Sequence, residues 1–476
     1  MSGTAIVWLR RDLRLADNPA LAAAVERADD VLPVFILDDG QSAWLPGGAS
    51  RWWLHHSLAA LDASLRRLGS RLILRRGRAS RIITDLVHET GASAVYWNRR
   101  YDRDGRATDT AIKAALKARS IEVESFNSAL LFEPWTVKTG AGGAFKVFTP
   151  FLKACRAAPS PPAPLPPPRK VGVPRAWPAS DALEDWALTP TRPDWAGGLR
   201  ATWHPGEHGA LQRLTDFVDQ GAPDYATRRD RPDIEGTSRL SPHLASGEIG
   251  PRQIWHAVHM ADERGGKSAE TFLKELVWRE FAYHLLYHHD TLPDANLRTS
   301  FDAFPWRDDP GALRAWQRGR TGIPIVDAGM RQLWQTGWMH NRARMIAGSF
   351  LVKNLLLHWR QGEDWFWDTL VDADLANNAF NWQWIAGSGA DAAPYFRIFN
   401  PVLQGERFDP DGAYVRTYVP ELAALSDAVI HKPWTAAPDV LARAGVTLGR
   451  DYPEPIVDLD ASRKRALAAF ATIKER

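Results

Sequence analysis

The sequence predicts two architectures in one chain, a doubly wound parallel-sheet α/β domain joined by a long linker to an all-helical domain. Three observations predict this fold class. The first 130 residues alternate short apolar runs with helix-like stretches, prolines concentrate at residues 159–178, and apolar residues beyond residue 200 recur at helical spacing. A length of 476 residues also suits several domains better than one.

The first domain, residues 1–130, alternates strand and helix patterns. The expected strands are Ala5–Leu9, Val31–Leu37, Arg71–Leu74, Ala94–Trp97 and Ile121–Phe126. The expected helices are Ala20–Arg27, Arg51–Leu68, Ser80–Thr90 and Ala107–Ala118. Hairpin signals are almost absent, so we expect a parallel sheet that binds ligands at the carboxyl ends of its strands. The usual phosphate-binding glycine motifs are missing, so a nucleotide here is supported by analogy alone.

Residues 131–200 are expected to form an interdomain linker. Nine prolines occur in the twenty residues 159–178. Proline lacks a backbone donor and favours an extended chain, so this stretch is predicted to be a spacer or surface crossing. A recognition motif for a proline-binding partner is the alternative.

The second domain, residues 201–476, is predicted to be all-helical. The expected helices are Ala210–Gln220, Pro251–Glu263, Ala269–His289, Ile325–Thr336, Asn341–Trp359 and Trp365–Leu370. This half holds 13 of the 22 tryptophans, an unusual surplus of a residue that packs, stacks on bases and carries redox chemistry.

The composition excludes several classes of protein. A net charge of +3 means that any contact with a polyanion must come from a local patch. A single cysteine, Cys155, excludes a disulfide framework and cysteine-rich metal sites. Early charges at the N-terminus argue against a secretory signal, and no long apolar run occurs. We therefore expect a soluble, cytoplasmic protein without a membrane partner.

Polar residues that could bind a ligand gather in three places. Thr237, Ser238 and Ser241 precede a helix, where hydroxyls either cap the free amides or help to bind an anion. Glu275, Trp278 and Arg279 fall within one turn, so they either point into one cavity or belong to an amphipathic helix with an i,i+4 ion pair. The third place is a polar stretch that opens the helix at Asn341–Met345, to which the same alternative applies.

The stretch Asp372–Trp384 contains the pair Asp372 and Asp374. Two such carboxylates could ligate a metal, but the histidines supply no accompanying ligand spacing, so no metal is predicted. The alternative is a helix cap together with an ion pair to a buried arginine.

On these motifs the sequence resembles the DNA photolyase/cryptochrome family over essentially its whole length, and most of all the bacterial cyclobutane pyrimidine dimer photolyases. The opening Trp8–Leu21 resembles the N-terminal motif of that family. The flavin-domain signatures are matched by Glu235–Ser241, Trp278–Phe281, Thr321–Arg331, Thr336–Arg342 and Asp372–Trp384.

The resemblance implies that the helical half binds FAD. The residues implied in cofactor binding are Tyr225, Thr237, Ser238, Arg239, Leu240, Ser241, Trp278, Arg279, Asn341, Arg344, Asp372, Ala373, Asp374 and Asn378. Arg344 is expected to pair with Asp372, and Asn378 to lie beside flavin N5. A neutral amide there can hydrogen-bond N5 without supplying a proton, which suits an anionic, fully reduced flavin.

The resemblance further implies light-driven repair of cyclobutane pyrimidine dimers in UV-damaged DNA, by electron transfer from excited FADH⁻ to a flipped-out dimer. The residues implied in substrate binding are Glu275, Trp278, Asn341, Arg342, Met345 and Trp384. Glu275 is also expected to be catalytic, because it can stabilise the dimer after it accepts the electron. Trp306, Trp359 and Trp382 match a three-tryptophan electron chain, although each could simply be a core indole.

The resemblance also implies a second, antenna chromophore in the α/β domain, either methenyltetrahydrofolate or a deazaflavin, and an empty antenna site is the alternative. The segment Tyr101–Arg106 is nearer to the deazaflavin pattern, and Gly47–His56 either contributes aromatic rings or only starts a helix. A monomer is expected. The alternatives to dimer repair are a cryptochrome-type blue-light photoreceptor and a photolyase for the six-four photoproduct.

Overall fold

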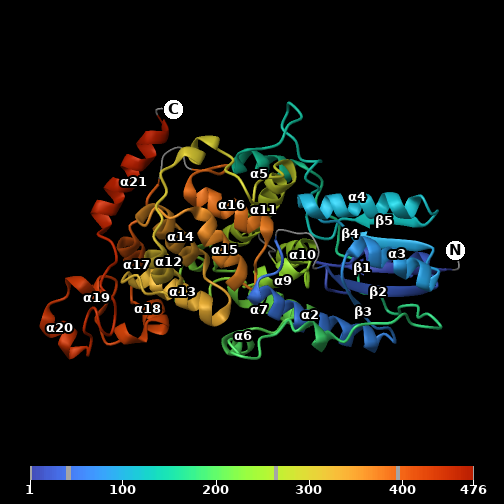
Figure 1. The fold of residues 1–476 in the computed structure, drawn as a ribbon, viewed down its shortest axis with the longest axis horizontal. Coiled ribbons are helices and arrows are strands. Elements are labelled where there is room, and N and C mark those ends of the chain that lie inside the picture. The colour runs from blue at the N-terminus through green and yellow to red at the C-terminus, as the bar shows by residue number, and fades with distance from the viewer. Residues whose placement is uncertain (1–2, 39–43, 262–265, 393–396, 475–476) are drawn as a thin grey trace.

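The computed structural model describes residues 3–38, 44–261, 266–392 and 397–474. The N-terminal domain holds one parallel five-stranded sheet in the order β3-β2-β1-β4-β5. Its strands are β1 (Thr4–Leu9), β2 (Asp30–Leu37), β3 (Ile73–Arg76), β4 (Ala94–Asn98) and β5 (Glu122–Phe126). Its helices are α1 (Pro19–Arg27), α2 (Gly48–Arg67), α3 (Ala79–Thr90) and α4 (Arg103–Lys117), and they cover the two faces of the sheet (Figure 1).

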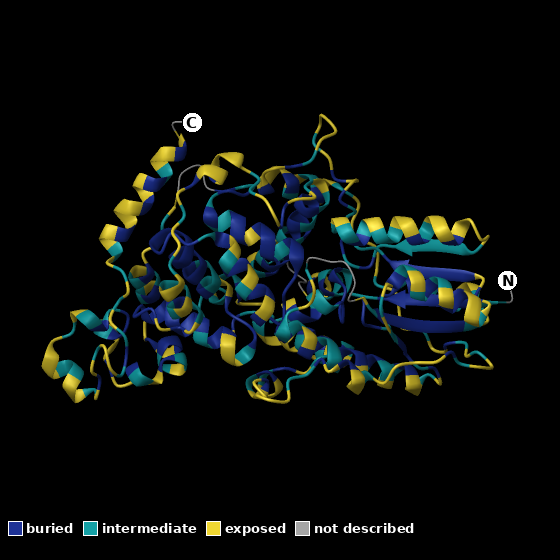
Figure 2. Cartoon of the chain, in the orientation of Figure 1, coloured by how far each residue is buried: buried dark blue, intermediate teal, exposed yellow. Residues whose placement is uncertain are grey.

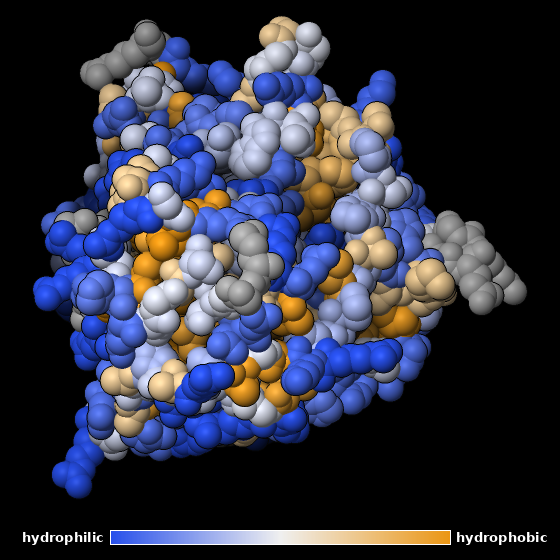
Figure 3. Space-filling model, turned by 90° about the vertical axis from the view of Figure 1, so that its right-hand side faces the viewer, coloured by the Kyte–Doolittle hydropathy of each residue, from blue (hydrophilic) through white to orange (hydrophobic). Residues whose placement is uncertain are grey.

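The predicted fold class is confirmed, and each expected strand and helix of this domain is present with small shifts. The largest strand shift is in β3, which begins two residues later than predicted because Ile73 pairs with Val34 and Arg76 with Leu37. The central strands β1, β2 and β4 are almost fully buried (Figure 2). Burial on both faces explains why they read as continuous apolar runs. Hydrophilic side chains cover most of the outer end of this domain, with apolar residues gathered in smaller patches (Figure 3).

The rest of the chain is helical. The α-helices are α5 (Phe148–Ala157), α6 (Gly197–Thr202), α7 (Glu207–Asp216), α8 (Tyr225–Arg228), α9 (Ser241–Ser246), α10 (Pro251–Ala261), α11 (Lys267–His288), α12 (Pro310–Gln317), α13 (Pro324–Thr336), α14 (Asn341–Ser349), α15 (Trp359–Thr369), α16 (Leu375–Ala386), α17 (Pro401–Phe408), α18 (Ala413–Tyr418), α19 (Asp427–Ile430), α20 (Pro438–Arg443) and α21 (Leu459–Lys474). Short 3₁₀ turns are η1 (Leu183–Trp186), η3 (Thr299–Ala303), η5 (Pro420–Leu422) and η6 (Pro433–Thr435), and π turns are η2 (Phe217–Gly221) and η4 (Phe350–Asn354). The large core joins α11 and α13–α16.

One helix prediction is wrong. The apolar pattern predicted a single helix over Asn341–Trp359, but α14 ends at Ser349, a π turn follows, and the chain leaves the helix before α15 begins at Trp359. Leu356 has a φ of 56°, which a continuing helix cannot hold. The predicted helix Trp365–Leu370 is the second half of α15, and the end of the predicted Pro251–Glu263 lies outside the described residues.

The proline-rich stretch 159–178 forms neither helix nor strand and is largely exposed. It is anchored to the α/β domain by buried Val171 and by the backbone bond from Val31 N–H to Gly172 O. The stretch therefore crosses a surface, as the spacer interpretation predicts.

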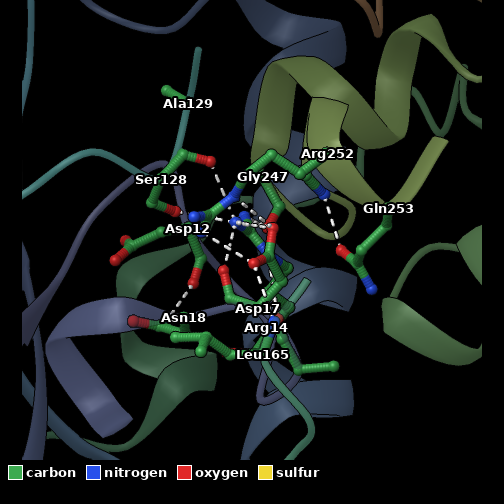
Figure 4. Close-up of polar contacts among 12 residues, drawn as sticks. Asp12, Arg14, Asp17, Asn18, Ser128, Ala129, Leu165, Gly247, Arg252 and Gln253 are labelled. Atoms are coloured by element: carbon green, nitrogen blue, oxygen red, sulfur yellow. Dashed lines mark hydrogen bonds and ion pairs between the residues drawn. The ribbon is translucent and has the colours of Figure 1, made fainter. Parts of the chain in front are cut away.

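A buried polar cluster joins the two domains (Figure 4). Arg14, which follows β1, donates to Gly247 O at 2.9 Å and to Ser128 Oγ at 2.7 Å. Asp17 in turn lies 2.7 Å from Arg252 Nη2 at the start of α10. Arg14 and Asp17 are at most 1% exposed. Paired charges taken fully out of water need fixed geometry, so this cluster holds the sheet domain in register with α9 and α10.

Candidate functional site

Two carboxylates lie at the start of α16, where the sequence places the Asp372–Asp374 motif. Asp372 Oδ2 accepts from Arg344 Nη2 on α14 at 2.7 Å, so the expected ion pair is confirmed. Asp374 caps α16 by accepting from Asn377 N–H, and it also accepts from the Tyr283 hydroxyl at 2.5 Å. The second oxygen of Asp372, Oδ1, is buried and has no hydrogen-bond partner among the described residues. A ligand N–H would satisfy that oxygen.

The candidate cofactor segment Thr237–Ser241 is connected to this pair through Trp338, which contacts both Ser241 and Arg344. Of the two alternatives for its hydroxyls, helix capping is wrong, because the N-cap residue of α9 is Leu240 and no side chain caps the helix in this described segment. Ser241 Oγ instead accepts from Trp338 Nε1 at 3.2 Å, while Ser238 Oγ accepts from Leu240 N–H.

Trp338 connects this segment with the ion pair described above. The guanidinium groups of Arg239 and Arg344 lie 5.2 and 5.9 Å from its ring centre. The sequence motif included Trp338, but we did not single it out as a site residue. Tyr225, at the start of α8, packs among Phe217 and Phe272, and burial raises the pKa of its hydroxyl.

Asn378 lies one helical turn after Asp374 on α16 and is 8% exposed. Its side-chain amide donates to the backbone carbonyl of Glu363 on α15 at 3.1 Å, and its carbonyl oxygen accepts no hydrogen bond from another described residue. Glu363 itself is fully buried, and its carboxylate oxygens have no partner within the described chain. Burial raises the pKa of this carboxyl well above its ordinary value. We did not single out Glu363 from the sequence, although a carboxylate at helical spacing among the apolar residues of α15 is a signal that could have identified it.

Two of the three candidate chain tryptophans, Trp359 and Trp382, lie on α15 and α16, and Trp306 lies in the segment between η3 and α12. Trp382 on α16 packs against Gly362 on α15, and Trp359 lies three residues before that glycine. Trp359 is stacked on His358, with ring centres 5.6 Å apart, and His358 lies 5.1 Å from Trp306. Trp382 and Trp359 are buried, whereas Trp306 is half-buried. Trp359 and Trp306 are thus connected through the ring of His358, and Trp382 lies against the helix that begins at Trp359.

The three candidate residues on α11, which are Glu275, Trp278 and Arg279, do not point to a common partner. Glu275 accepts from Arg229 Nη1 at 2.5 Å, so the i,i+4 ion pair with Arg279 that we considered is wrong. Arg279 donates to Ala129 O at 2.6 Å and lies over the ring of Tyr283.

The aromatic residue of this turn, Trp278, lies between two phenyl rings. It is stacked on Phe148 with ring centres 3.4 Å apart, and on Phe380 of α16 with ring centres 6.1 Å apart. Trp384 follows Phe380 by four residues and so shares its face of α16.

The polar residues that open α14 form a second group. Asn341 Nδ2 and Arg342 Nη1 lie 3.9 and 3.8 Å from Met345 Sδ. Arg342 also pairs with Asp230 at 2.7 Å, immediately after the Arg229 that holds Glu275. Two consecutive residues after α8 therefore link the α11 candidates with the α14 candidates, a connection that no pattern in the sequence indicates.

A cavity of about 350 Å³ lies between the two domains, at the carboxyl ends of β1 and β2. Its lining includes Trp8 and Arg10, Trp53 of α2, Gly105 of α4, and Ala373. Trp8 Nε1 and Arg10 Nε are buried and make no hydrogen bond to any described residue. Both segments that the sequence singled out for an antenna contribute to this lining, and Ala373 lies here between the two carboxylates of the cofactor motif.

In residues 3–38, 44–261, 266–392 and 397–474, no group of three His, Cys, Asp or Glu side chains is arranged to hold a metal ion. Within the same described ranges, no helix combines the length and apolar character needed to cross a membrane.

Comparisons with known proteins agree with this arrangement. Residues 5–169 match the family model described as DNA photolyase, and residues 272–472 match that described as FAD binding domain of DNA photolyase. A deoxyribodipyrimidine photo-lyase of Agrobacterium fabrum is 55% identical over 99% of this chain and 98% of its own. Cryptochrome-1 of Arabidopsis thaliana is 41% identical over 98% of this chain and 70% of its own. The crystal structure of a bacterial class III photolyase from Agrobacterium tumefaciens superposes with a TM-score of 0.97 at 54% identity, covering 100% of this chain and 98% of that one.

The sheet domain, the helical domain and the matched FAD-binding region define a two-domain protein of the flavin-binding class. The chain belongs to the DNA photolyase/cryptochrome family.

Proposed function

We propose that this chain is a photolyase that repairs cyclobutane pyrimidine dimers in UV-damaged DNA, with FAD held between the Thr237–Ser241 segment and the start of α16. The observation that carries the proposal is the buried, unpartnered Oδ1 of Asp372. A flavin presents an imide N–H, which is the donor this oxygen lacks, while Arg344 fixes the other oxygen. Bound there in its reduced form and excited by blue light, FAD supplies one electron to the lesion and receives it back after the ring has split.

Asn378 suits a reduced flavin. One N–H of its amide is bound to the Glu363 carbonyl, and its carbonyl oxygen would serve as an acceptor for the cofactor. Reduced flavin carries a proton at N5 that such an acceptor can hold. Ser241 and Trp338 form a polar contact beside the same site, and Arg344 supplies a positive charge there.

The lesion is proposed to bind between α11, α14 and α16. A dimer must leave the base stack to be reached, and it would stack on Trp384, with stacking worth about 1–3 kcal/mol per base. Phe148 and Phe380 cover the faces of Trp278, so Trp278 would contact the dimer through the edge of its ring. Asn341 and Met345 would form the opposite wall. Glu275 would receive the polar edge of the base, and Arg342 would contact the DNA backbone.

The Trp382–Trp359–Trp306 series is proposed to deliver electrons that reduce oxidised flavin. Two members are buried and one is half-buried, as a route from solvent to the cofactor requires. The interdomain cavity is proposed to bind the antenna chromophore. It is large enough for a small planar ligand, and Trp8 Nε1 and Arg10 Nε are donors that match the carbonyl acceptors of a pterin or a deazaflavin.

One experiment tests the repair activity. The purified protein, with its flavin reduced, is mixed with a thymine-dimer oligonucleotide in the dark or under blue light. Restored thymines only in the light support dimer repair. Flavin photoreduction without repair indicates the photoreceptor, and repair of the six-four photoproduct alone indicates that photolyase. The absorption spectrum of the same sample identifies the antenna, because a folate and a deazaflavin add different bands to those of flavin.

A further inference from the structure

Two oppositely charged residues at the end of α8 connect the helices that carry the proposed lesion site. Arg229 Nη1 lies 2.5 Å from Glu275 Oε1 on α11. Asp230, the next residue, lies 2.7 Å from Arg342 Nη2 on α14. We call Arg229 and Asp230 the α8 bridge. Each ion pair therefore holds one group that the proposed function assigns to substrate, namely Glu275 and Arg342.

Arg229 and Arg342 are each paired with a carboxylate before DNA binds. The four side chains are between 17% and 39% exposed, and ion pairs of such exposure contribute little net stability, so their partners can be exchanged. Arg342 is also held over the ring of Phe408 at 4.2 Å, and its buried Nε has no hydrogen-bond partner among the described residues. Its guanidinium thus stays in place and keeps a donor available if Asp230 is replaced by another anion.

We propose that Arg229 and Arg342 exchange carboxylates for DNA phosphates only when a lesion enters the site, an inference that rests on the proposed function. An undamaged duplex keeps its bases stacked, and its phosphates meet two closed ion pairs. An everted dimer draws the flanking backbone toward α11 and α14. There a phosphate can accept two charge-assisted hydrogen bonds from each arginine, in the bidentate geometry that a guanidinium favours. Glu275, left by Arg229, accepts instead from the imide N–H of a thymine ring.

The exchange predicts a salt signature. Each arginine–phosphate contact steepens the fall of log affinity with log salt by about 0.9. The lesion complex gains two such contacts over the undamaged complex, so its slope is steeper by about 1.8. Raising the salt from about 0.05 M to about 0.2 M therefore lowers the preference for lesion DNA by about twelvefold.

The test is equilibrium binding of the flavin-loaded protein, in the dark, to two fluorescent duplexes that differ only in one thymine dimer. Slopes that differ by about 1.8 support the exchange, and equal slopes overturn it. Arg229→Gln should reduce the slope for lesion DNA by about 0.9 and leave the slope for undamaged DNA unchanged. Asp230→Asn releases Arg342 for undamaged DNA, whose slope should rise by about 0.9.

Asp439→Asn is the matched control, because Asp439 pairs with Arg443 at 2.9 Å on α20, away from the bridge. It should leave both slopes unchanged. If Arg229→Gln does not fold, Asp230→Asn decides the matter alone, since an amide replaces a partly exposed carboxylate of the same shape. Preferential binding of dimer DNA with equal slopes would refute the exchange and leave the repair function standing. Absence of both dimer preference and light-driven repair in the wild-type protein would refute the repair function itself.

Discussion

Two glycines face the same indole, that of Trp382, and they differ in how much room the ring leaves them. A Cβ added at Gly362 on α15 would lie 2.1, 2.5 and 2.6 Å from three ring atoms of Trp382. A Cβ added at Gly348 on α14 would lie 3.6 and 3.7 Å from the same ring. Carbon atoms in contact normally lie about 3.5–4.0 Å apart. Gly362→Ala therefore forces the indole or α15 to move by roughly 1.4 Å, whereas Gly348→Ala forces nothing.

The expected energies follow from this geometry. Overpacking a core costs about 1–3 kcal/mol, and replacing a helical glycine by alanine returns up to about 1 kcal/mol. Gly348→Ala should gain helix stability without overpacking the core. The two variants should differ by about 1–3 kcal/mol in the free energy of unfolding, with Gly362→Ala the less stable. Because Trp382 is the innermost member of the proposed electron chain, Gly362→Ala should also slow flavin photoreduction.

Three measurements on each variant check this reasoning: urea unfolding, the rate of photoreduction with an external thiol, and dimer repair by chemically reduced protein. Gly362→Ala should lose stability and photoreduction while repair by prereduced protein persists, and Gly348→Ala should match the wild type in both light reactions. Equal photoreduction rates in the two variants would refute the placement of Trp382 in the chain.

Three further predictions concern single side chains. Trp306→Phe should impair flavin photoreduction and spare repair by chemically reduced protein. Equal loss of both reactions would refute the proposed delivery of electrons through the three tryptophans. Glu275→Ala should lower the repair yield while FAD stays bound, and loss of FAD from the purified variant would instead make Glu275 structural. Burial lowers the pKa of His284 to about 4, so the folded protein binds this proton less readily than the unfolded chain. Above pH 6.5 the imidazole is neutral in both states, so it does not affect the free energy of unfolding. As the pH falls from 6.5 toward 4, the unfolded chain takes up the proton first, and the free energy of unfolding decreases by up to ~3 kcal/mol. Urea unfolding at several pH values should show a smaller acid loss in His284→Gln, and parallel curves for variant and wild type would contradict the assignment.

The sequence predicted the sheet domain because buried parallel strands and amphipathic helices leave strong local periods. It did not predict the break before α15, since the apolar pattern runs through it unchanged. That break depends on a distant contact, in which Arg307 N–H donates to Leu356 O, and on the His358 side chain, which caps α15. Histidine is a weak sequence signal for a cap, so the pattern gave no reason to end the helix.

In the candidate site, too, some contacts could be predicted from the sequence and others could not. The Arg344–Asp372 pair could be expected from the family resemblance, and the structure confirms it. The partner of Glu275 could not, because Arg229 lies 46 positions away and a nearer arginine was available at helical spacing. Partners at that distance are set by how α8 packs beside α11, which no local pattern encodes.

Part of the tryptophan surplus can now be assigned to two locations. One set, including Trp8, Trp53 and Trp367, lines the interdomain cavity. A second set runs from Trp382 outward along α15. The residues between the two sets, Val371–Asp374, present Ala373 to the cavity and Asp372 to Arg344. Because this short segment borders both proposed ligand sites, a substitution in it that suits one site can disturb the other. A bulkier side chain at Ala373 would fill the interdomain cavity and push the adjacent carboxylates, so binding of the proposed antenna and binding of the flavin should be lost together there, whereas they should be lost separately at Trp53 and Asp372.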